Sequence, residues 1–306
     1  MIEISNVTKY IDKKNIISDL SFSANQHECL GLFGEDPAAK TLLLNILSGT
    51  TSPSSGHVTV QGINPQVLKI KKAIGYQLDR DLGHPTMSAN AFLHFIASIR
   101  GFHGAEKRAR VEHAAMRLEL WPILNAPLDT LCTGWKRKVA IAQAILHGPA
   151  LLLLDEPTEG LAPDQKHTFR ALIRSLTQEM TVIIASRHCD ELSELCTRAL
   201  VLAGGRLVAD TPLPDLQRDS RHFQAVTLTA HAPLDLLALA VLPGVAGIEE
   251  HRHAPGTVTV LAMPGHNISS HIHTLIASRR WQISSLHQES GRLNDVVHHL
   301  SREATL

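Results

Sequence analysis

The chain has 306 residues, of which 44% are hydrophobic, and this length and composition allow one large and one small domain with apolar cores. Lys and Arg together number 29, as do Asp and Glu, so no basic excess favours nucleic acid as the main partner. No apolar run approaches the roughly 20 residues that span a bilayer, which argues against a membrane-spanning chain.

The first residues and the cysteines indicate the cellular compartment of the protein. Met1–Ile4 opens into an alternating, strand-like pattern rather than a signal peptide. The four cysteines are scattered without metal-type spacing, which fits a reducing compartment. Adjacent or alternate histidines such as His298/His299 do not converge on a metal, so we expect solvated polar faces there. The sequence therefore predicts a soluble, cytoplasmic protein.

The first quarter of the chain is rich in short apolar or alternating runs that predict strands. These runs are Ile2–Ile4, Ile16–Phe22, Cys29–Phe33, His57–Gln61 and Ala73–Gln77. We expect the first two to form a hairpin and the last two to form a second strand pair. The third is typical of a strand covered on both faces. It leads into a loop at Gly34 and a helix from Lys40 to about Ser48, which Gly49 ends.

The middle of the chain alternates between helical and strand patterns. From Ser88 to about Ile145 apolar residues recur at helical spacing. Strands are then predicted at Leu151–Leu154, Thr181–Ala185 and Ala199–Leu202, with a helix at Pro163–Gln178. Strands that alternate with helices indicate a mainly parallel α/β sheet, here with an inserted helical region.

The last third of the chain predicts a separate small domain. Two prolines and mixed charges in Thr211–Arg221 are typical of a linker. The elements that follow read strand, helix, strand, strand, helix, strand and helix: Ala225–Ala230, Leu234–Leu242, Val245–Glu249, Thr257–Ala262, Ile268–Ser278, Gln282–Leu286 and Arg292–Arg302. This order predicts a ferredoxin-like domain. We expect domains at residues 1–215, with a helical part at about 80–145, and at 222–306.

Gly34 and the pair Lys40-Thr41 have the spacing of a phosphate-binding loop between a strand and a helix. In such a loop successive backbone N–H groups face the phosphates, and the helix N-terminus adds positive potential. Lys40 would contact the β- and γ-phosphates, and the Thr41 hydroxyl would bind Mg²⁺. Taken alone, the same spacing is also found in ordinary strand-to-helix turns.

Polar residues follow two later strands as well. Asp155 ends a buried strand, where a carboxylate can bind Mg²⁺ directly or through water, and Glu156 could polarise an attacking water as general base. The alternative for this pair of acids is helix N-capping. His188 follows the strand Thr181–Ala185 and should lie at the same sheet edge, because ligands of open α/β sheets bind at the carboxyl ends of strands.

Several segments of residues 1 to about 215, taken in their order along the chain, resemble motifs of the ATP-binding subunits of ABC transporters. The resemblance is carried by Gly34–Thr41 as the Walker A loop, Ile74–Asp79 as the Q-loop, Leu131–Trp135 as the signature, Leu151–Glu156 as Walker B, Glu159–Pro163 as the D-loop and His188 as the switch histidine. It implies an α/β fold of the P-loop NTPase type, with an ABC ATPase domain, an inserted helical subdomain and a small α+β ferredoxin-like C-terminal domain.

The same resemblance implies ATP and Mg²⁺ as ligands and assigns residues to them. The nucleotide-binding set is Gly34, Glu35, Asp36, Pro37, Ala38, Ala39, Lys40 and Thr41, with Cys132, Thr133 and Gly134 reaching the γ-phosphate across a dimer. The catalytic residues are Glu156 and His188, and the Mg²⁺ ligands are Thr41, Asp79 and Asp155.

Segments of the C-terminal domain resemble the appended domain of ABC-2 exporter ATPases, including those of the gliding-motility type. They are Leu242–Val245, Arg279–Ile283 and Arg292–Val297. This implies a separate integral membrane permease as partner, together with a homodimer or a heterodimer with another ABC ATPase. It also implies a cytoplasmic protein, peripheral on the inner face of the cell membrane, that does not act on nucleic acid.

Several residues depart from the family pattern. Pro37, where a glycine is usual, has φ fixed near about −65° and no N–H. Ala39 adds a methyl group where the backbone would approach a phosphate. Cys132 replaces a serine, Thr133 a glycine and Ala162 an aspartate. Two interpretations remain open: an ATPase subunit that drives a permease, and a catalytically impaired subunit that is a partner or scaffold for an active ATPase.

Overall fold

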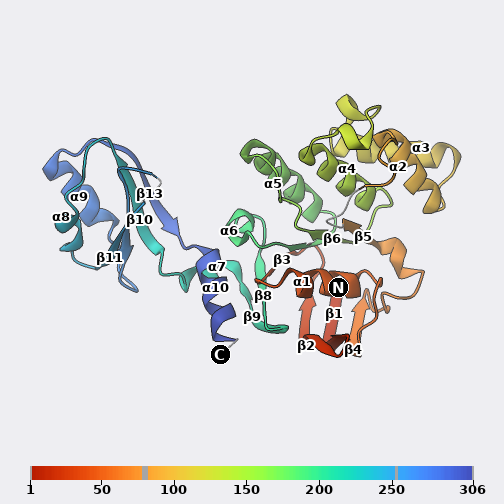
Figure 1. Ribbon diagram of the computed structural model, residues 1–306, viewed down its shortest axis with the longest axis horizontal. Coiled ribbons are helices and arrows are strands. Elements are labelled where there is room, and N and C mark those ends of the chain that lie inside the picture. The colour runs from red at the N-terminus through yellow and green to blue at the C-terminus, as the bar shows by residue number, and fades with distance from the viewer. Residues whose placement is uncertain (1, 78–81, 252–253, 305–306) are drawn as a thin grey trace. The chain divides into compact units, whose positions relative to one another are not determined.

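The computed structural model describes residues 2–77, 82–251 and 254–304. The chain divides into two units, which Figure 1 draws in colours that run along the sequence. The first unit runs to Thr211 and includes the chain again from Leu300, and the second spans Pro212–His299. In the described ranges, none of the helices has the length and apolar character needed to cross a membrane.

The first unit is built on a six-stranded sheet with the strand order β5-β6-β7-β3-β8-β9. Its strands are β3 (Cys29–Phe33), β5 (Ile74–Gln77), β6 (Leu151–Asp155), β7 (Thr181–Ala185), β8 (Arg198–Ala203) and β9 (Arg206–Pro212). From β5 to β8 each strand pairs in parallel with its neighbour. Every residue of β3, β6 and β7 is buried, which explains why their sequences are apolar without alternation. The predicted mainly parallel sheet is confirmed.

A second sheet of the first unit is antiparallel, with the order β2 (Lys14–Ala24), β1 (Ile2–Ile11) and β4 (Ser55–Val60). The predicted hairpin of the first two strands is confirmed. The predicted pairing of His57–Gln61 with Ala73–Gln77 is wrong, because β4 pairs with β1 whereas β5 pairs with β6. Alternation of apolar residues identifies a strand and its buried face, but it does not specify a partner distant in the sequence.

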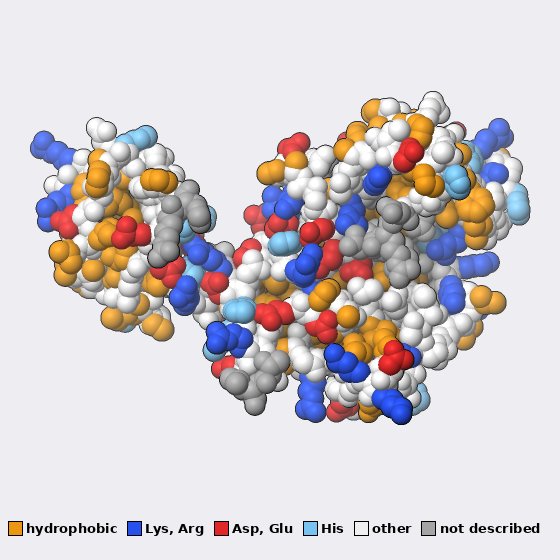
Figure 2. Space-filling view, in the orientation of Figure 1, with side chains coloured by type: hydrophobic (Ala, Val, Ile, Leu, Met, Phe, Trp, Pro, Cys, Tyr) orange, Lys and Arg blue, Asp and Glu red, His pale blue; other side chains and the backbone are white. Residues whose placement is uncertain are grey.

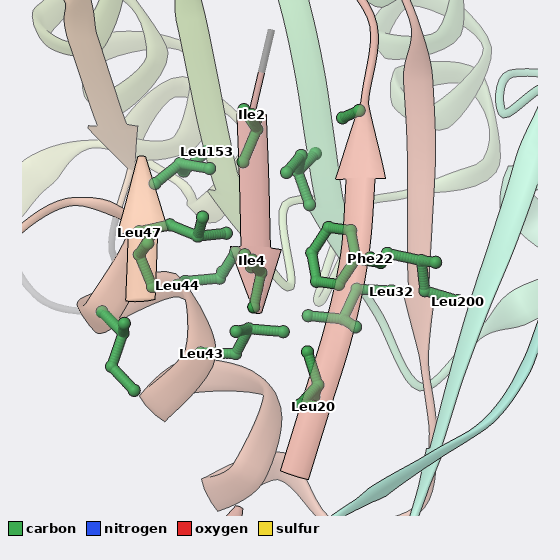
Figure 3. Packing of buried hydrophobic residues seen from close by; sticks show 14 of the residues in the cluster. Ile2, Ile4, Leu20, Phe22, Leu32, Leu43, Leu44, Leu47, Leu153 and Leu200 are labelled. Atoms are coloured by element: carbon green, nitrogen blue, oxygen red, sulfur yellow. The ribbon is translucent and has the colours of Figure 1, made fainter. Parts of the chain in front are cut away.

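Helix α1 (Pro37–Leu47) packs against strands of both sheets and supplies much of the core between them. Leu43, Leu44 and Leu47 are completely buried, and each such side chain stabilises the fold by about 1.5–3 kcal/mol. In Figure 3 they lie among labelled side chains of both sheets: Ile2, Ile4, Leu20, Phe22, Leu32, Leu153 and Leu200.

The predicted start of this helix at Lys40 is wrong, because α1 begins at Pro37. Asp36 is its N-cap residue, and its carboxylate accepts hydrogen bonds from the first-turn amides. Proline suits the first helical position, where its missing N–H has no partner to lose. The phosphate-loop residues Pro37, Ala38 and Ala39 therefore belong to the first turn of the helix.

The predicted helical region consists of α2 (Ala89–Ile99), α3 (Gly104–Arg117) and α4 (Thr133–Ile145). The three helices contact one another, and α4 also contacts β5 of the parallel sheet. Two further helices follow strands of that sheet: α5 (Pro163–Thr177) contacts β7, and α6 (Cys189–Leu192) contacts β3.

The second unit begins with α7 (Leu213–Arg218) and continues as β10 (Phe223–Ala230), α8 (Leu236–Ala240), β11 (Val245–Glu250), β12 (Thr257–Ala262), α9 (Ser269–Arg279), β13 (Ile283–Ser290) and the first part of α10 (Leu293–Glu303), whose residues from Leu300 belong to the first unit. Its sheet order is β11-β12-β10-β13, and all neighbours are antiparallel. This is the ferredoxin-like arrangement that the element order predicted. The boundary between the two units follows Thr211, within the linker predicted at Thr211–Arg221, and most of that segment forms α7, with Pro214 in its first turn, where proline is tolerated.

His222 is the buried centre of an ion cluster in the second unit. Its ring is 1% exposed, with Nε2 at 2.8 Å from Glu249 Oε2 and Nδ1 at 2.6 Å from Asp295 Oδ2. Burial alone would raise the pKa of Glu249, but the hydrogen bond to His222 and the nearby cations hold it below its ordinary value. The imidazole thus links β11 to α10 through two carboxylates.

We expect His222→Ala to lower the free energy of unfolding of the second unit by about 2 kcal/mol. Breaking a fully buried pair costs roughly 3–5 kcal/mol, and the loss is smaller here because both carboxylates are partly exposed. Hydrogen exchange of β11 and α10 under mild denaturant measures the change. His287→Ala, on the exposed side of β13, is the matched control, and equal protection in the two variants would contradict the prediction.

Candidate functional site

The turn between β3 and α1 is fixed by Gly34 and Asp36. Gly34 has a φ of 143°, and a Cβ there would collide with the carbonyl oxygen of Leu202, so only glycine fits. Asp36 Oδ1 accepts hydrogen bonds from the amides of Ala38 at 2.8 Å and Ala39 at 3.4 Å. The N-terminal amides of α1 thus hold an oxyanion, as helix N-termini do. The exposed residues of the turn are Glu35, Asp36, Pro37 and Ala38.

Lys40 is buried at the centre of the site, with 1% of its surface exposed. Its Nζ donates to the Gly34 carbonyl oxygen at 2.5 Å and lies 3.9 Å from Glu156 Oε1. Burial lowers the pKa of Lys40, and the charge of Glu156 opposes this shift. The ammonium group is therefore held between a carbonyl and a carboxylate at the carboxyl end of β3.

Thr41 and Asp155 meet beside Lys40 although they are distant in sequence. The Thr41 hydroxyl donates to Asp155 Oδ2 at 2.7 Å, and Gln77 Nε2 lies 3.4 Å from the Asp155 carbonyl oxygen. A hydroxyl and a carboxylate are hard oxygen ligands of the kind Mg²⁺ prefers. These two side chains therefore fit a magnesium site, and a bound cation would supply charge that phosphate oxygens need.

Glu156 has a strained backbone and a buried side chain. Its φ is 43°, and its backbone N–H donates to the Ala185 carbonyl oxygen at 2.9 Å. Its Oε2 accepts a hydrogen bond from the Arg187 amide at 3.2 Å. Its Oε1 is buried and has no hydrogen-bond donor among the described residues. A buried oxygen without a donor is costly, so this atom marks a place where water or a ligand can donate.

Arg187 and His188 are joined to Glu156 by a chain of ion pairs. The Arg187 guanidinium lies 3.5 Å from Glu156 Oε1 and 3.2 Å from Glu159 Oε2. His188 Nε2 lies 3.4 Å from the same Glu159 oxygen. His188 is thus connected to Glu156, the carboxylate of the Walker B segment, through Arg187 and through Glu159 of the D-loop segment.

The remaining predicted site residues are placed differently. Cys132, Thr133 and Gly134 lie at the start of α4, with Cys132 exposed at its N-cap. They lie beside the D-loop segment: a Cβ on Gly160 would come 3.1 Å from Thr133 Cγ2. Asp79 lies outside the described residues. The structure therefore gathers the Walker A, Walker B and histidine residues and leaves the signature residues at a separate place.

Sequence reasoning missed two residues of this group, Gln77 and Arg187. Gln77 is completely buried at the end of β5, and a polar residue that ends an apolar strand was the available signal. Arg187 follows β7 directly, in the position where side chains reach the ligand edge of an open sheet. Its ion pairs could not be read from the sequence because both carboxylates come from another segment.

Comparison of the sequence with known proteins identifies one family. The family model described as ABC transporter matches residues 17–159. The ABC transporter ATP-binding protein NatA of Bacillus subtilis is 30% identical over 220 residues, which cover 70% of this chain and 89% of that protein. The Nod factor export ATP-binding protein I of Rhizobium etli is 32% identical over 241 residues, or 78% and 76% of the two chains.

Solved structures show the same fold. An ATP-binding subunit of an ABC transporter has a TM-score of 0.64 at 21% identity, over 71% of this chain and 92% of its own. A bacterial ABC transporter cassette solved as a dimer has a TM-score of 0.63 at 22% identity, over 70% and 99% of the two chains. At this identity the likeness concerns the fold alone.

Proposed function

The chain belongs to the ATP-binding proteins of ABC transporters, and from this we propose that it is the ATP-binding subunit of an ABC-2-type exporter with a separate membrane permease. The observation that carries the proposal is the meeting of Lys40, Thr41, Asp155 and Glu156 at one end of the parallel sheet. The proposal includes the two-domain division at residues 1–215 and 222–306.

In this proposal the buried cation and the helix N-terminus hold the phosphates of ATP. Lys40 contacts the β- and γ-phosphates. Mg²⁺ is held by Thr41, Asp155 and Asp79, the last of which lies outside the described residues. Glu156 accepts a proton from the attacking water, and His188 contacts the γ-phosphate. Cys132–Gly134 would act on the nucleotide of a second cassette. Dimerisation is supported by the structural relative that was solved as a dimer.

The exporter role is supported by the relatives and by an apolar surface. One relative is named for Nod factor export and another for linearmycin resistance. Phe95 and Ile99 of α2 are 52% and 66% exposed, and at a spacing of four residues they share a helix face. Exposed apolar side chains that share a face suit contact with another protein. On the face drawn in Figure 2, acidic and basic side chains of the first unit are interspersed, which suits a protein partner better than nucleic acid. We place the chain on the inner face of the cell membrane, against its permease.

The role is tested by purifying the tagged chain from detergent-solubilised membranes of its own host. We expect a polytopic membrane protein to co-purify, and we expect its recovery to fall at least tenfold when Phe95 and Ile99 are both replaced by Asp. Met116→Asp, at an apolar position of α3 that is 58% exposed, is the matched control and should retain the partner. A chain that captures no membrane protein, or that captures it equally after either change, would contradict the proposed docking.

A further inference from the structure

Arg187 makes several contacts with the carboxylates of the candidate site. Its guanidinium lies between two carboxylates, those of Glu156 and Glu159, and its backbone amide donates to Glu156 as well. Arginine suits this position because its planar group offers several donors in fixed directions. One residue thus donates a hydrogen bond to Glu156 Oε2 and places its cation 3.5 Å from Oε1, and its own side chain is 49% exposed to solvent.

Glu156 needs such a partner because its side chain is only 7% exposed. An ionised carboxylate in such surroundings is costly unless a cation is near. Lys40 is one cation, at 3.9 Å from Oε1, but in the proposed function its ammonium group contacts the β- and γ-phosphates of ATP. Arg187 is then the cation that continues to face this carboxylate among the described residues.

The same guanidinium also acts on His188. Glu159 Oε2 lies within 3.4 Å of His188 Nε2 and 3.2 Å of the guanidinium. Arg187 therefore helps to hold the Glu159 carboxylate, which is 40% exposed and lies beside the His188 ring. Two groups assigned to the reaction, a base and a γ-phosphate contact, thus depend on one arginine.

We propose that Arg187 is a positioning residue for ATP hydrolysis, which holds Glu156 and, through Glu159, His188 in the arrangement the reaction needs. The inference rests on the proposed function and extends it from ATP binding to turnover. In the reaction, the water oxygen forms a bond to the terminal phosphorus and the bond from that phosphorus to the bridging oxygen breaks. Glu156 takes the proton of the water and releases it to solvent after ADP and phosphate leave.

The test compares steady-state ATP turnover of the full chain with that of Arg187→Ala and Arg187→Lys. We expect kcat of Arg187→Ala to fall about 10–100-fold with KM changed less than about threefold, because the missing contacts orient the base rather than bind ATP. Arg187→Lys should recover part of the rate. Since the position is half exposed, low-millimolar guanidinium should also raise the rate of Arg187→Ala, whereas equal sodium chloride should not. Arg174→Ala, which removes an exposed ion pair with Glu194, is the matched control with unchanged kcat.

Several results would overturn the inference. Arg187→Ala with equal or faster turnover would show that the arginine restrains Glu156 instead. A loss of rate that neither Lys nor guanidinium restores would indicate general structural damage. A natural chain that Mg-ATP stabilises but that turns over no ATP would overturn the inference and leave ATP binding intact. A chain that Mg-ATP does not stabilise would contradict the proposed function itself.

Discussion

Lys40→Ala is expected to abolish the thermal stabilisation of the chain by Mg-ATP. A ligand present at about 100 times its Kd stabilises the native state by about 2.7 kcal/mol, which corresponds to a rise in Tm of roughly 5–10 °C for a unit of this size. The Lys40 ammonium is a buried cation in the first turns of α1, and it is held only 3.9 Å from Glu156. Without it, a polyphosphate would face the carboxylates Asp155 and Glu156 with no buried lysine or arginine of the described residues between them.

Differential scanning fluorimetry over a series of Mg-ATP concentrations measures this effect. Lys40→Ala also leaves a cavity and removes one of the two cations that face Glu156, so its Tm without ligand should fall. The comparison is therefore between ligand-induced shifts within each variant. Lys166→Ala, which removes the ion pair with Glu191 at the surface of α5, should keep the full shift. A natural chain without any shift, or an equal shift in Lys40→Ala, would contradict the assignment of this site to ATP.

Glu156→Gln is expected to lower ATP turnover by about 10²–10⁴-fold, the usual contribution of general-base catalysis, while the Mg-ATP shift in Tm persists. The amide has nearly the same shape, and its oxygen can still accept the hydrogen bond that the Arg187 backbone donates to Oε2. It cannot take a proton from water. The backbone strain at φ 43° is unchanged by this replacement, so the loss would report chemistry rather than folding.

Coupled-assay kinetics and the same fluorimetry measure the two parts of this prediction. Glu194→Gln, an exposed residue paired with Arg174, is the control and should leave kcat unchanged. Retained turnover in Glu156→Gln would place the base elsewhere. A natural chain that binds Mg-ATP without turnover would favour the alternative of a non-hydrolysing subunit.

The sequence predicted best those elements whose burial is uniform. β3, β6 and β7 are buried along their whole length, so their apolar runs needed no knowledge of their neighbours. The partner of β4 was predicted wrongly because strand pairing depends on segments far away in the chain. The two prolines of the predicted linker did not exclude a helix, because Pro214 lies in the first turn of α7, where proline is compatible with helical structure.

The residues of the candidate site likewise divide into those that the sequence predicted and those that it did not. Thr41, Asp155 and Glu156 were found from the sequence because they follow or begin elements with clear patterns, and the structure brings them together. The start of α1 was misplaced although Asp36 and Pro37 are typical N-cap and first-turn residues. The family pattern of a loop had outweighed that local signal. Arg187 was not predicted because its role depends on two ion pairs, and ion pairs leave no periodic trace in a sequence.

Helix α1 makes ligand affinity and folding stability inseparable in this chain. Lys40 and Thr41 occupy the same three turns as Leu43, Leu44 and Leu47, which lie in the core. A backbone adjustment at the ligand end is therefore transmitted to close-packed side chains, where even a methylene group matters. The exposed turn at residues 35–38 lies outside this packing, so substitutions there disturb the core less. Substitutions in that turn could therefore raise, lower or abolish the affinity of the site for its ligand while the protein remained folded.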